Sequence, residues 1–287
     1  MNKSVGQLLE KHDFKFSKSK GQNFLIDGNI PEKIARLSGI DESCGVLEIG
    51  PGVGALTTWL CRIAGKVTAA EIDDRLIPIL KETLCENENV ELVCGDILKL
   101  DIAKLVNEKM PGLRHVVCAN LPYNITSPAL AALIDANVFE TITVMVQREV
   151  AKRLCAAPGT ADYGAFTVYI NYHTQPEILF DVPPECFMPR PRVFSSVVTM
   201  KTRAERLLAP EDELRFFKVV RAAFGQRRKT LVNALYSAFS RKMEKEEITD
   251  IVASCGFNPK IRGETLGIEE FIKLSAYFNK SASPPPQ

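Results

Sequence analysis

Residues 45–54 read Gly-Val-Leu-Glu-Ile-Gly-Pro-Gly-Val-Gly, a short apolar run followed at once by a glycine-rich turn. The next segment, from Leu56 to Leu60, carries apolar residues at helical spacing. We therefore expect a strand, a tight turn and a helix in direct succession. The three glycines of the turn would let its backbone approach a ligand closely.

The same alternation continues over the next hundred residues, where short apolar runs alternate with helix-like stretches. This pattern predicts βαβ units around a parallel sheet, and hence an α/β fold. The expected strands are 45–49, 67–70, 90–93, 115–119 and 141–146. Two later runs, 168–170 and 196–200, are further strand candidates.

The pattern changes near Leu207, beyond which no segment is typical of a strand. Apolar residues recur there at helical spacing, which predicts a small helical domain. The chain closes on a tail with three consecutive prolines, which cannot bury an apolar face and is predicted to be disordered. We therefore expect an α/β domain over 1–206, a helical domain over 207–280 and a tail over 281–287.

Composition limits the possible classes of protein. The chain has 287 residues, 46% hydrophobic and 25% charged, which is ordinary for a soluble globular protein with a full core. Because no run approaches the roughly 18–20 apolar residues of a membrane span and no apolar signal core opens the chain, we expect a cytoplasmic protein. The eight cysteines form no C-x-x-C pair, so we expect reduced, mostly buried thiols and no metal site.

Positive charge is concentrated in two places although the formal net charge is only +1. Between Arg190 and Lys229 there are eleven Lys and Arg against four Asp and Glu, a local excess of seven. The N-terminal arm adds four lysines, at positions 11, 15, 18 and 20. Local asymmetry of this kind is typical of surfaces that contact phosphate groups.

Three polar residues, Glu71, Asp96 and Asn120, close successive predicted strands at nearly even intervals. Ligands of open α/β sheets bind at the carboxyl ends of the strands, so we expect all three on one rim. A single carboxylate at a strand end could equally be a cap or a solvated turn, but a periodic set favours a shared site. Glu71 would accept hydrogen bonds from both hydroxyls of a ribose, and Asp96 would receive an adenine amino group.

The spacing of the turn helps to choose the ligand. G-x-G turns after a strand also occur in dinucleotide enzymes, but those have the pyrophosphate-type spacing G-x-G-x-x-G. Here Gly50, Gly52 and Gly54 give G-x-G-x-G instead. This spacing favours an adenosyl amino acid, S-adenosylmethionine, with Gly50 and Gly52 against it.

The tetrapeptide Asn120-Leu121-Pro122-Tyr123 is suited to capture a planar amine. Adenine N6 is a poor nucleophile because its lone pair is delocalised into the ring. If the Asn120 side-chain carbonyl and a backbone carbonyl of Leu121 or Pro122 accept its two hydrogens, the lone pair is directed at a methyl donor. No general base is needed for this step, since the attacking amine is neutral.

Aromatic rings would hold the extruded base. Unstacking a nucleotide costs a few kcal/mol, and each base–aromatic stack returns about 1–3 kcal/mol. Tyr123 is the first candidate ring, and Phe187, flanked by prolines at 189 and 191, is the second. The alternative for Phe187 is a position in the core, where phenylalanine is often buried.

These motifs together resemble the ribosomal RNA adenine dimethyltransferase family, over nearly the whole chain and especially in its bacterial small-subunit branch. Gly21-Gln22-Asn23-Phe24-Leu25 matches the N-terminal motif, which implies that Asn23 and Leu25 help to close over the cofactor. The motifs around Gln147 and Phe187 match further family segments. One departure is Phe166-Thr167, where the family pattern has Leu-Ser, a change that preserves size class and hydroxyl.

The resemblance implies a Rossmann-like class I sheet with a small α-helical C-terminal domain. It implies a monomeric enzyme that uses S-adenosylmethionine to dimethylate two adjacent adenosines near the 3′ end of small-subunit rRNA, in an assembling subunit and without an obligate protein partner. The basic stretch 224–231 matches the family pattern F-x-x-R-R-K-T-L. The expected RNA contacts are Arg221, Arg227, Arg228 and Lys229, although a solvated helix face would carry similar charges.

Three alternatives stay open. The erythromycin-resistance branch shares the Asn-Leu/Ile-Pro-Tyr core and methylates one adenine of large-subunit rRNA, but the basic stretch and the extended C-terminal region favour the small-subunit branch. A non-catalytic assembly or transcription factor on the same fold would not need the intact tetrapeptide 120–123. A nicotinamide dehydrogenase would need a hydride-site acid or base near the turn, and none is evident.

Overall fold

The computed structural model describes residues 5–17 and 21–278. Two lysines of the N-terminal arm, at positions 18 and 20, and the tail predicted to be disordered, 281–287, lie outside these described ranges. Within them, no helix is long and apolar enough to cross a membrane. Five of the eight cysteines are buried, as the sequence predicts, and Cys85 and Cys94 are exposed.

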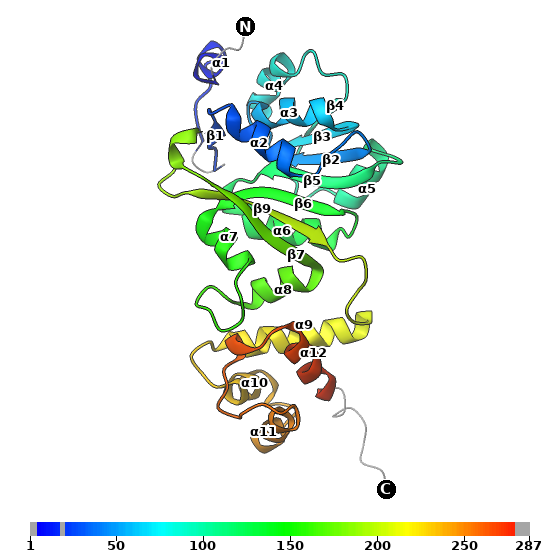
Figure 1. The fold of residues 1–287 in the computed structure, drawn as a ribbon, viewed down its shortest axis with the longest axis vertical. Helices are drawn as coiled ribbons and strands as arrows, with labels where there is room; N and C mark the ends of the chain where they lie inside the picture. The colour runs from blue at the N-terminus through cyan, green and yellow to red at the C-terminus, as the bar shows by residue number, and fades with distance from the viewer. Residues whose placement is uncertain (1–4, 18–20, 279–287) are drawn as a thin grey trace. The chain divides into compact units, whose positions relative to one another are not determined.

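A seven-stranded sheet organises most of the chain, in the order β4-β3-β2-β5-β6-β9-β7 (Figure 1). Its first five strands run parallel. They follow the predicted strands to within one residue at either end: β2 (Cys44–Ile49), β3 (Lys66–Glu71), β4 (Val90–Cys94), β5 (Arg114–Asn120) and β6 (Thr141–Gln147). Every residue of β2 is buried, which explains why this strand has a continuous apolar run rather than an alternating one.

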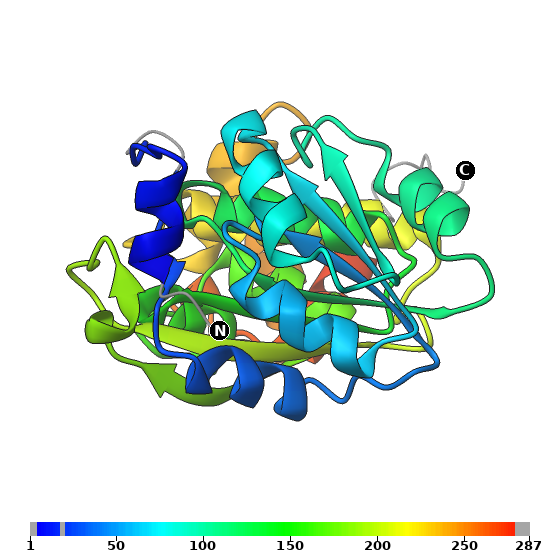
Figure 2. The same cartoon turned by 90° about the horizontal axis from the view of Figure 1, so that it is seen from above.

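Helices connect the parallel strands, as the alternation of the sequence predicts. They are α3 (Ala55–Ile63), α4 (Ile77–Thr83), α5 (Ile102–Lys109) and α6 (Thr126–Asp135), and a further helix, α2 (Asn29–Leu37), precedes β2. Figure 2 shows α2 and α3 side by side, and their buried residues share one apolar cluster with β2, in which Ile34 and Leu60 have no exposed surface. Pro78 lies in the first turn of α4, where it displaces no hydrogen bond.

Two strands complete one edge of the sheet. β9 (Ser195–Thr202), predicted as 196–200, pairs antiparallel with β6, and β7 (Thr174–Val182) lies beyond it. β7 was not predicted, because its exposed residues and Pro176 break the apolar pattern. A separate two-stranded sheet pairs β1 (Phe24–Leu25) with β8 (Phe187–Met188), and so joins the N-terminal motif to the segment before β9.

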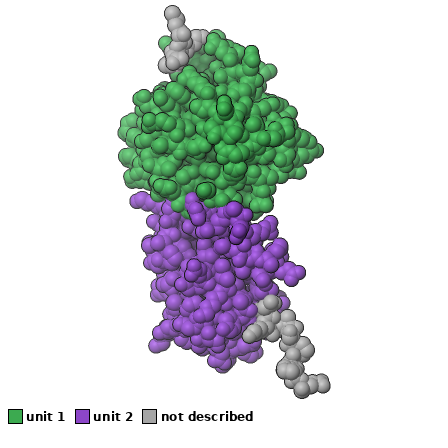
Figure 3. All heavy atoms as spheres, turned by 45° about the vertical axis from the view of Figure 1, so that its right-hand side comes forward, with its two compact units in different colours: residues 1–151, 176–202 green, residues 152–175, 203–287 purple. Residues whose placement is uncertain are grey.

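The chain forms two compact units, coloured separately in Figure 3. Unit 1 comprises residues 1–151 and 176–202, and unit 2 comprises 152–175 and 203–287. This division differs from the contiguous domains expected over 1–206 and 207–280. The second boundary lies close to the expected one, but residues 152–175 belong with the C-terminal helices.

Unit 2 is helical. Its main helices are α8 (Ala165–His173), α9 (Pro210–Gly225), α10 (Leu231–Phe239), α11 (Lys245–Ser254) and α12 (Ile268–Tyr277). The chain first passes from unit 1 into unit 2 within α7 (Arg148–Leu154). The prediction of a strand at 168–170 is wrong, because these residues lie within α8. Val168 and Tyr172, one helical turn apart, pack in the core of unit 2 with Phe216 and Phe271, so tertiary burial outweighs their β propensity.

Candidate active site

The candidate site lies in unit 1, where the strand order of the sheet reverses. Chain order runs outward from β2 through β3 to β4 on one side, and from β5 to β6 on the other. β2 and β5 are parallel neighbours, with Leu47 opposite Val117. The turns that follow these two strands, 50–54 and 121–123, therefore meet at the switch point, the usual ligand site of an open α/β sheet.

The glycine turn after β2 depends on left-handed backbone conformations. Gly50, Gly52 and Gly54 have φ angles of +66°, +61° and +86°, which residues with a Cβ rarely adopt. At Gly52 the crowding adds to this, because a Cβ would lie 2.8 Å from the ring of Phe24. The turn thus needs glycine both for its conformation and for the close approach of the N-terminal segment.

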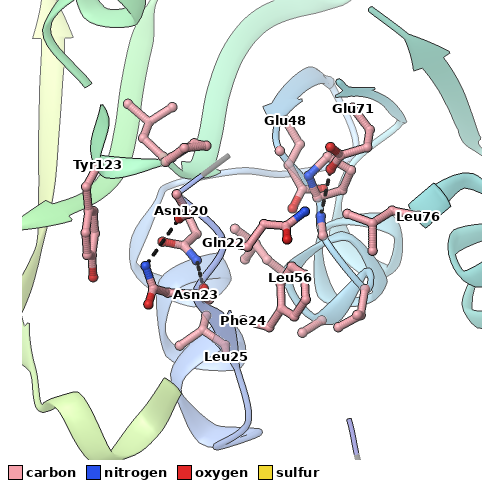
Figure 4. A pocket seen from close by; sticks show the side chains of 18 residues that line it. Gln22, Asn23, Phe24, Leu25, Glu48, Leu56, Glu71, Leu76, Asn120 and Tyr123 are labelled. Carbon is pink, nitrogen blue, oxygen red and sulfur yellow. Dashed lines mark hydrogen bonds between the residues drawn. The ribbon is translucent and has the colours of Figure 1, made fainter. Parts of the chain in front are cut away.

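The first cavity at this point encloses about 600 Å³, part of it open to solvent. Its lining comes from the N-terminal motif, the glycine turn, the end of β3 and the tetrapeptide after β5. Among the predicted site residues it includes Asn23, Leu25, Gly50, Gly52, Glu71, Asn120, Leu121, Pro122 and Tyr123 (Figure 4).

Glu71 is the last residue of β3 and is 4% exposed. Its Oε1 accepts a hydrogen bond from the amide of Asp73 at 2.8 Å. Its Oε2 accepts one from the amide of Gly52 at 3.3 Å (Figure 4). Burial raises the pKa of the Glu71 carboxyl, and the two hydrogen bonds from backbone amides oppose this shift. The side chain is therefore held against the glycine turn. Each carboxylate oxygen has a second lone pair that can accept a hydrogen bond from a ligand.

Glu48 is a second buried carboxylate in the cavity lining, and the sequence analysis missed it. It lies near the end of β2, is 1% exposed, and its Oε2 has no hydrogen-bond partner among the described residues. Burial, assisted by the charge of Glu71, raises the pKa of Glu48 to about 8. Glu48 could have been predicted as a site residue, because it is the one carboxylate in an otherwise apolar strand just before a glycine turn.

A second cavity of about 580 Å³, also partly open to solvent, adjoins the first, and both are lined by Gly50 and Pro122. Asp96 lines this second cavity together with Ile72, Ile97 and Leu98. Its Oδ1 accepts the amide hydrogen of Leu98 at 3.1 Å, an arrangement that fixes the turn after β4. The structure therefore places Asp96 on the same rim as Glu71 and Asn120 but in the neighbouring hollow, among apolar side chains suited to a planar ring.

Asn120 ends β5, and its amide orientation follows from one contact. The Nδ2 group donates to the backbone carbonyl of Asn23 at 3.2 Å (Figure 4). Since a carbonyl only accepts, Oδ1 must be the opposite end of this amide, free to accept from a ligand. This contact joins residues 97 positions apart, so no local sequence pattern predicts it.

The two candidate backbone acceptors beside Asn120 differ in their existing contacts. The carbonyl of Pro122 already accepts from the amide of Ile125 at 3.2 Å and from the hydroxyl of Thr126 at 3.3 Å. These bonds belong to the short helix η3 (Tyr123–Ile125) and the start of α6. The geometry therefore favours Leu121 over Pro122 as the second acceptor for an amine.

Tyr123 borders the first cavity and is held at its hydroxyl. Its Oη lies 2.6 Å from Oγ of Ser195, the first residue of β9. Burial raises the pKa of Tyr123, so the phenol is neutral near pH 7. The ring is thus anchored at its far end, while its near end is fixed by the backbone after β5.

The N-terminal motif closes one side of the first cavity. Gln22 donates to the buried carboxylate of Asp73 at 2.8 Å, and Asp73 in turn pairs with Arg75. Leu25 is 4% exposed and pairs with Phe187 in the small β1–β8 sheet. Gln22 and Phe24 line the cavity beside the expected Asn23 and Leu25, and the family motif was the signal for them.

Phe187 does not lie where a base-stacking ring is needed. It is 2% exposed and packs in the apolar cluster that contains Leu25, Ile34 and Val197. It is also absent from the lining of both cavities at the switch point. The structure therefore contradicts the exposed position expected for Phe187, because the β1–β8 pairing directs its ring into the core, which was the alternative interpretation.

The basic residues expected to contact RNA all lie in unit 2 and are exposed. Arg221 is on α9, and the other three are in the connection between α9 and α10. Arg227 is engaged within its unit, since Nε donates to Glu264 at 3.0 Å and Nη2 donates to the carbonyl of Ala161. Arg228 and Lys229 are therefore better placed than Arg227 to meet an external phosphate.

Comparison with known proteins assigns the family. The profile described as ribosomal RNA adenine dimethylase matches residues 13–279, which is most of the chain. The chain belongs to this family. The resemblance inferred from the motifs is thereby confirmed.

Relatives of this dimethylase-family chain match it over almost its full length. A protein from Alkaliphilus oremlandii named ribosomal RNA small subunit methyltransferase A is 45% identical over 95% of both chains. A protein of the same name from Clostridioides difficile is 46% identical over 96% of both chains.

Two solved structures confirm the Rossmann-like methyltransferase fold of the family member. A dimethyladenosine transferase from Plasmodium falciparum has a TM-score of 0.78 at 26% identity, over 90% of this chain and 98% of the other. The 23S rRNA methyltransferase ErmE has a TM-score of 0.69 at 27% identity, over 89% of this chain and 99% of the other. The fold is thus common to a protein named as a dimethyladenosine transferase and one named as a 23S rRNA methyltransferase.

Proposed function

We propose that this chain uses S-adenosylmethionine to dimethylate N6 of two adjacent adenosines near the 3′ end of 16S rRNA. The substrate would be the rRNA of an assembling small subunit, and the enzyme a cytoplasmic monomer without an obligate protein partner. Family membership supports the reaction class, and relatives at about 45% identity support the small subunit. The observation that carries the proposal is the position of Asn120 and Leu121 beside the glycine turn at the switch point.

The cavity residues fit the proposed cofactor. Glu48 presents a buried carboxyl oxygen without a partner in the described structure, and its ionised form, which a nearby cation favours, would accept from the cationic amino group of S-adenosylmethionine. Gly52 has no space for a side chain, so the turn offers backbone rather than side-chain surface. Glu71 would hold the ribose hydroxyls and Asp96 the adenine amino group, with Asn23 and Leu25 closing the site. When bound, the cofactor supplies a sulfonium-activated methyl group.

The residues after β5 would activate the target amine. Oδ1 of Asn120 and the carbonyl of Leu121 would each accept one N6 hydrogen, which withdraws the nitrogen lone pair from conjugation. Both acceptors are fixed before the substrate binds. Asn120 donates a hydrogen bond to the carbonyl of Asn23, and the backbone amide of Leu121 donates one to the carbonyl of Met145 at 3.1 Å. Such preorganisation is effective because no group must reorient as the reaction proceeds.

Tyr123 would receive the extruded adenine. Unstacking costs a few kcal/mol, and one aromatic stack returns about 1–3 kcal/mol, so a single ring roughly balances the cost. With Phe187 buried, the two hydrogen bonds at N6 would supply the remaining stabilisation. The two acceptors would discriminate against guanine and uracil, which carry a carbonyl at the corresponding ring position.

A methyl-transfer assay tests the activity and its substrate together. Tritiated methyl groups from S-adenosylmethionine should enter under-methylated 30S subunits in the presence of the wild type and not in that of Asn120→Ala. Asn107→Ala, on the exposed side of α5, is the matched control and should keep full activity. Equal incorporation with Asn120→Ala would refute the proposed role of the tetrapeptide.

The large-subunit alternative needs its own measurement, since a structural relative is a 23S rRNA methyltransferase. Primer extension across both rRNAs of a strain that lacks the gene, with and without the gene restored, locates the modified adenines. Stops at two adjacent adenosines near the 3′ end of 16S rRNA support the proposal. Stops confined to 23S rRNA would overturn it, and parallel assays on naked rRNA and intact 70S ribosomes would define the substrate's assembly state.

A further inference from the structure

Ser195 stands out among the residues that the proposed chemistry leaves unused. It is fully buried, and its hydroxyl lies 2.6 Å from the hydroxyl of Tyr123. Its local sequence does not distinguish it, since the next residue is also a serine, and Ser196 is buried to the same extent. Its importance comes from the strand that carries it.

β9 brings Ser195 to the cavity because it runs against the other strands. The parallel strands end at the rim that holds Asn120, whereas an antiparallel strand begins there. Ser195 is paired with Gln147, the last residue of β6, and β6 adjoins β5. The first side chain of β9 can therefore reach a residue that follows β5, across 72 positions of sequence.

We infer that Ser195 is a positioning residue that fixes the ring of Tyr123 for stacking on the target adenine. The inference rests on the proposed function. Tyr123 is attached at its backbone to the turn after β5, and without a second attachment its ring could rotate about the side-chain bonds. The Ser195 hydroxyl ties the far end of the ring to the sheet. The plane of the ring is thereby set before a base arrives.

The neighbouring serine gives a matched control. Ser196 is equally buried in the same strand and forms a hydrogen bond of the same length, 2.6 Å, to Oδ1 of Asp181 on the other side of the strand. Removing either hydroxyl deletes one partly buried hydrogen bond from β9. Only the change at Ser195 releases Tyr123.

The test compares Ser195→Ala, Tyr123→Phe, their double variant and Ser196→Ala on under-methylated 30S subunits. Because one hydrogen bond is lost in each case, kcat/KM for RNA should fall about 3- to 10-fold in Ser195→Ala and in Tyr123→Phe. The double variant should lose no more than either single variant, since both remove the same bond. Ser195→Thr, which keeps the hydroxyl, should restore most of the activity.

Two further readouts separate positioning from damage to the fold. Affinity for S-adenosylhomocysteine, measured by calorimetry, should be unchanged in every variant, and Ser195→Ala should lose thermal stability only as much as Ser196→Ala. The inference is overturned if Tyr123→Phe and Ser195→Ala retain wild-type kcat/KM, if their effects add, or if Ser196→Ala loses as much activity. If the wild type itself transfers no methyl group to RNA, the proposed function fails instead.

Discussion

Under the proposed function, single residues in the cavity should divide between those that hold the cofactor and those that hold the base. Glu71→Ala removes a buried carboxylate that also anchors Gly52, so affinity for S-adenosylhomocysteine should fall about 10- to 100-fold, as for a lost charge-assisted hydrogen bond. Calorimetric titration measures this loss. Glu140→Ala, which breaks only an exposed ion pair with Arg114, should bind like the wild type.

Tyr123→Ala should produce the opposite result. Because the proposed role of its ring is to stack on the base, cofactor affinity should be unchanged while turnover on 30S subunits falls about 5- to 100-fold, the loss expected for one stacked ring. Single-turnover methyl transfer at saturating cofactor measures the rate. An unchanged rate would show that stacking on Tyr123 is not part of catalysis.

Glu48 should make stability depend on pH. Its carboxyl has a pKa of about 8 in the folded protein against 4.5 as the reference, so the folded state retains a proton that the unfolded state has released. The free energy of unfolding should therefore be greatest below about pH 4.5 and fall as pH rises toward 8, by at least about 2 kcal/mol. Glu48→Gln should lack this decline. Parallel urea-unfolding series at pH 5, 6, 7 and 8 measure it, and identical pH slopes would contradict the assignment.

The sequence was informative for residues whose position follows from strand ends. Glu71, Asp96 and Asn120 were predictable because parallel strands end on a common rim, and the structure places all three there. Ser195 was not, because its contact depends on the register of an antiparallel strand far along the chain. Phe187 was misplaced because aromatic character alone does not distinguish a buried ring from an exposed one.

At the scale of elements, the turn between β2 and α3 should tolerate no side chain at Gly52. An alanine there would be strained at a φ of +61° and would press against the ring of Phe24, so the close fit of the N-terminal motif should be lost. We expect Gly52→Ala to weaken binding of S-adenosylhomocysteine at least about 10-fold by calorimetry, as for one lost polar contact with the turn.

Gly112 provides the matched control for this backbone effect. Its φ is +77°, and a Cβ there would have no neighbour within 4 Å. Gly112→Ala should therefore lose about 1 kcal/mol of stability from backbone strain alone and bind cofactor normally. Equal losses of affinity in both variants would show that contact with Phe24 is irrelevant.

The connection between α9 and α10 should contribute to RNA binding. Reversing both charges in the double variant Arg228→Glu/Lys229→Glu should weaken binding to 30S subunits about 10-fold at low salt and flatten its salt dependence, because fewer counterions are released. Filter binding over a salt series measures both effects. Arg241→Glu/Lys242→Glu, on the exposed turn after α10, should have a smaller effect, and equal losses would indicate a general charge effect.

Elements were most readily predicted where they are buried or follow the strand–helix alternation. β2, β3, β5 and β6 could be identified because burial on both faces produces continuous apolar runs, and β4, an edge strand whose residues are only partly buried, could be identified from its place in the alternation. β7 was missed because its exposed residues interrupt that pattern, and β1 and β8 because two residues carry no period. The run 168–170 was misassigned, since β-branched and aromatic residues also fill the buried face of α8.

For the whole molecule, the division into units predicts which fragments fold. A fragment over 1–206, the domain expected from sequence, would retain α8 without the helices that bury Tyr163, Val168 and Tyr172 in the core of unit 2. It should therefore expose apolar surface, bind the dye ANS and aggregate at concentrations where the full chain remains monodisperse. Size-exclusion chromatography and dye fluorescence measure this.

A second fragment distinguishes this explanation from general sensitivity to truncation. In a chain with 152–175 replaced by a short glycine–serine linker and ended at residue 202, unit 1 would keep all seven strands of the sheet, β7 from Pro176 onward, and would lack α8. This fragment should be more soluble than 1–206. Equal aggregation of both would contradict the assignment of 152–175 to the C-terminal unit.

The interleaving of the two units also has a consequence for synthesis. The N-terminal strands leave the ribosome first, but the sheet gains β7 and β9 only after residues 152–175 have emerged. The apolar side chains of those residues then remain exposed until α12, about a hundred residues later, has been translated. A nascent chain of this protein therefore carries an unsatisfied helix for several seconds at typical elongation rates of about 5–20 residues per second, an interval in which it depends on chaperones or on the shelter of the exit tunnel.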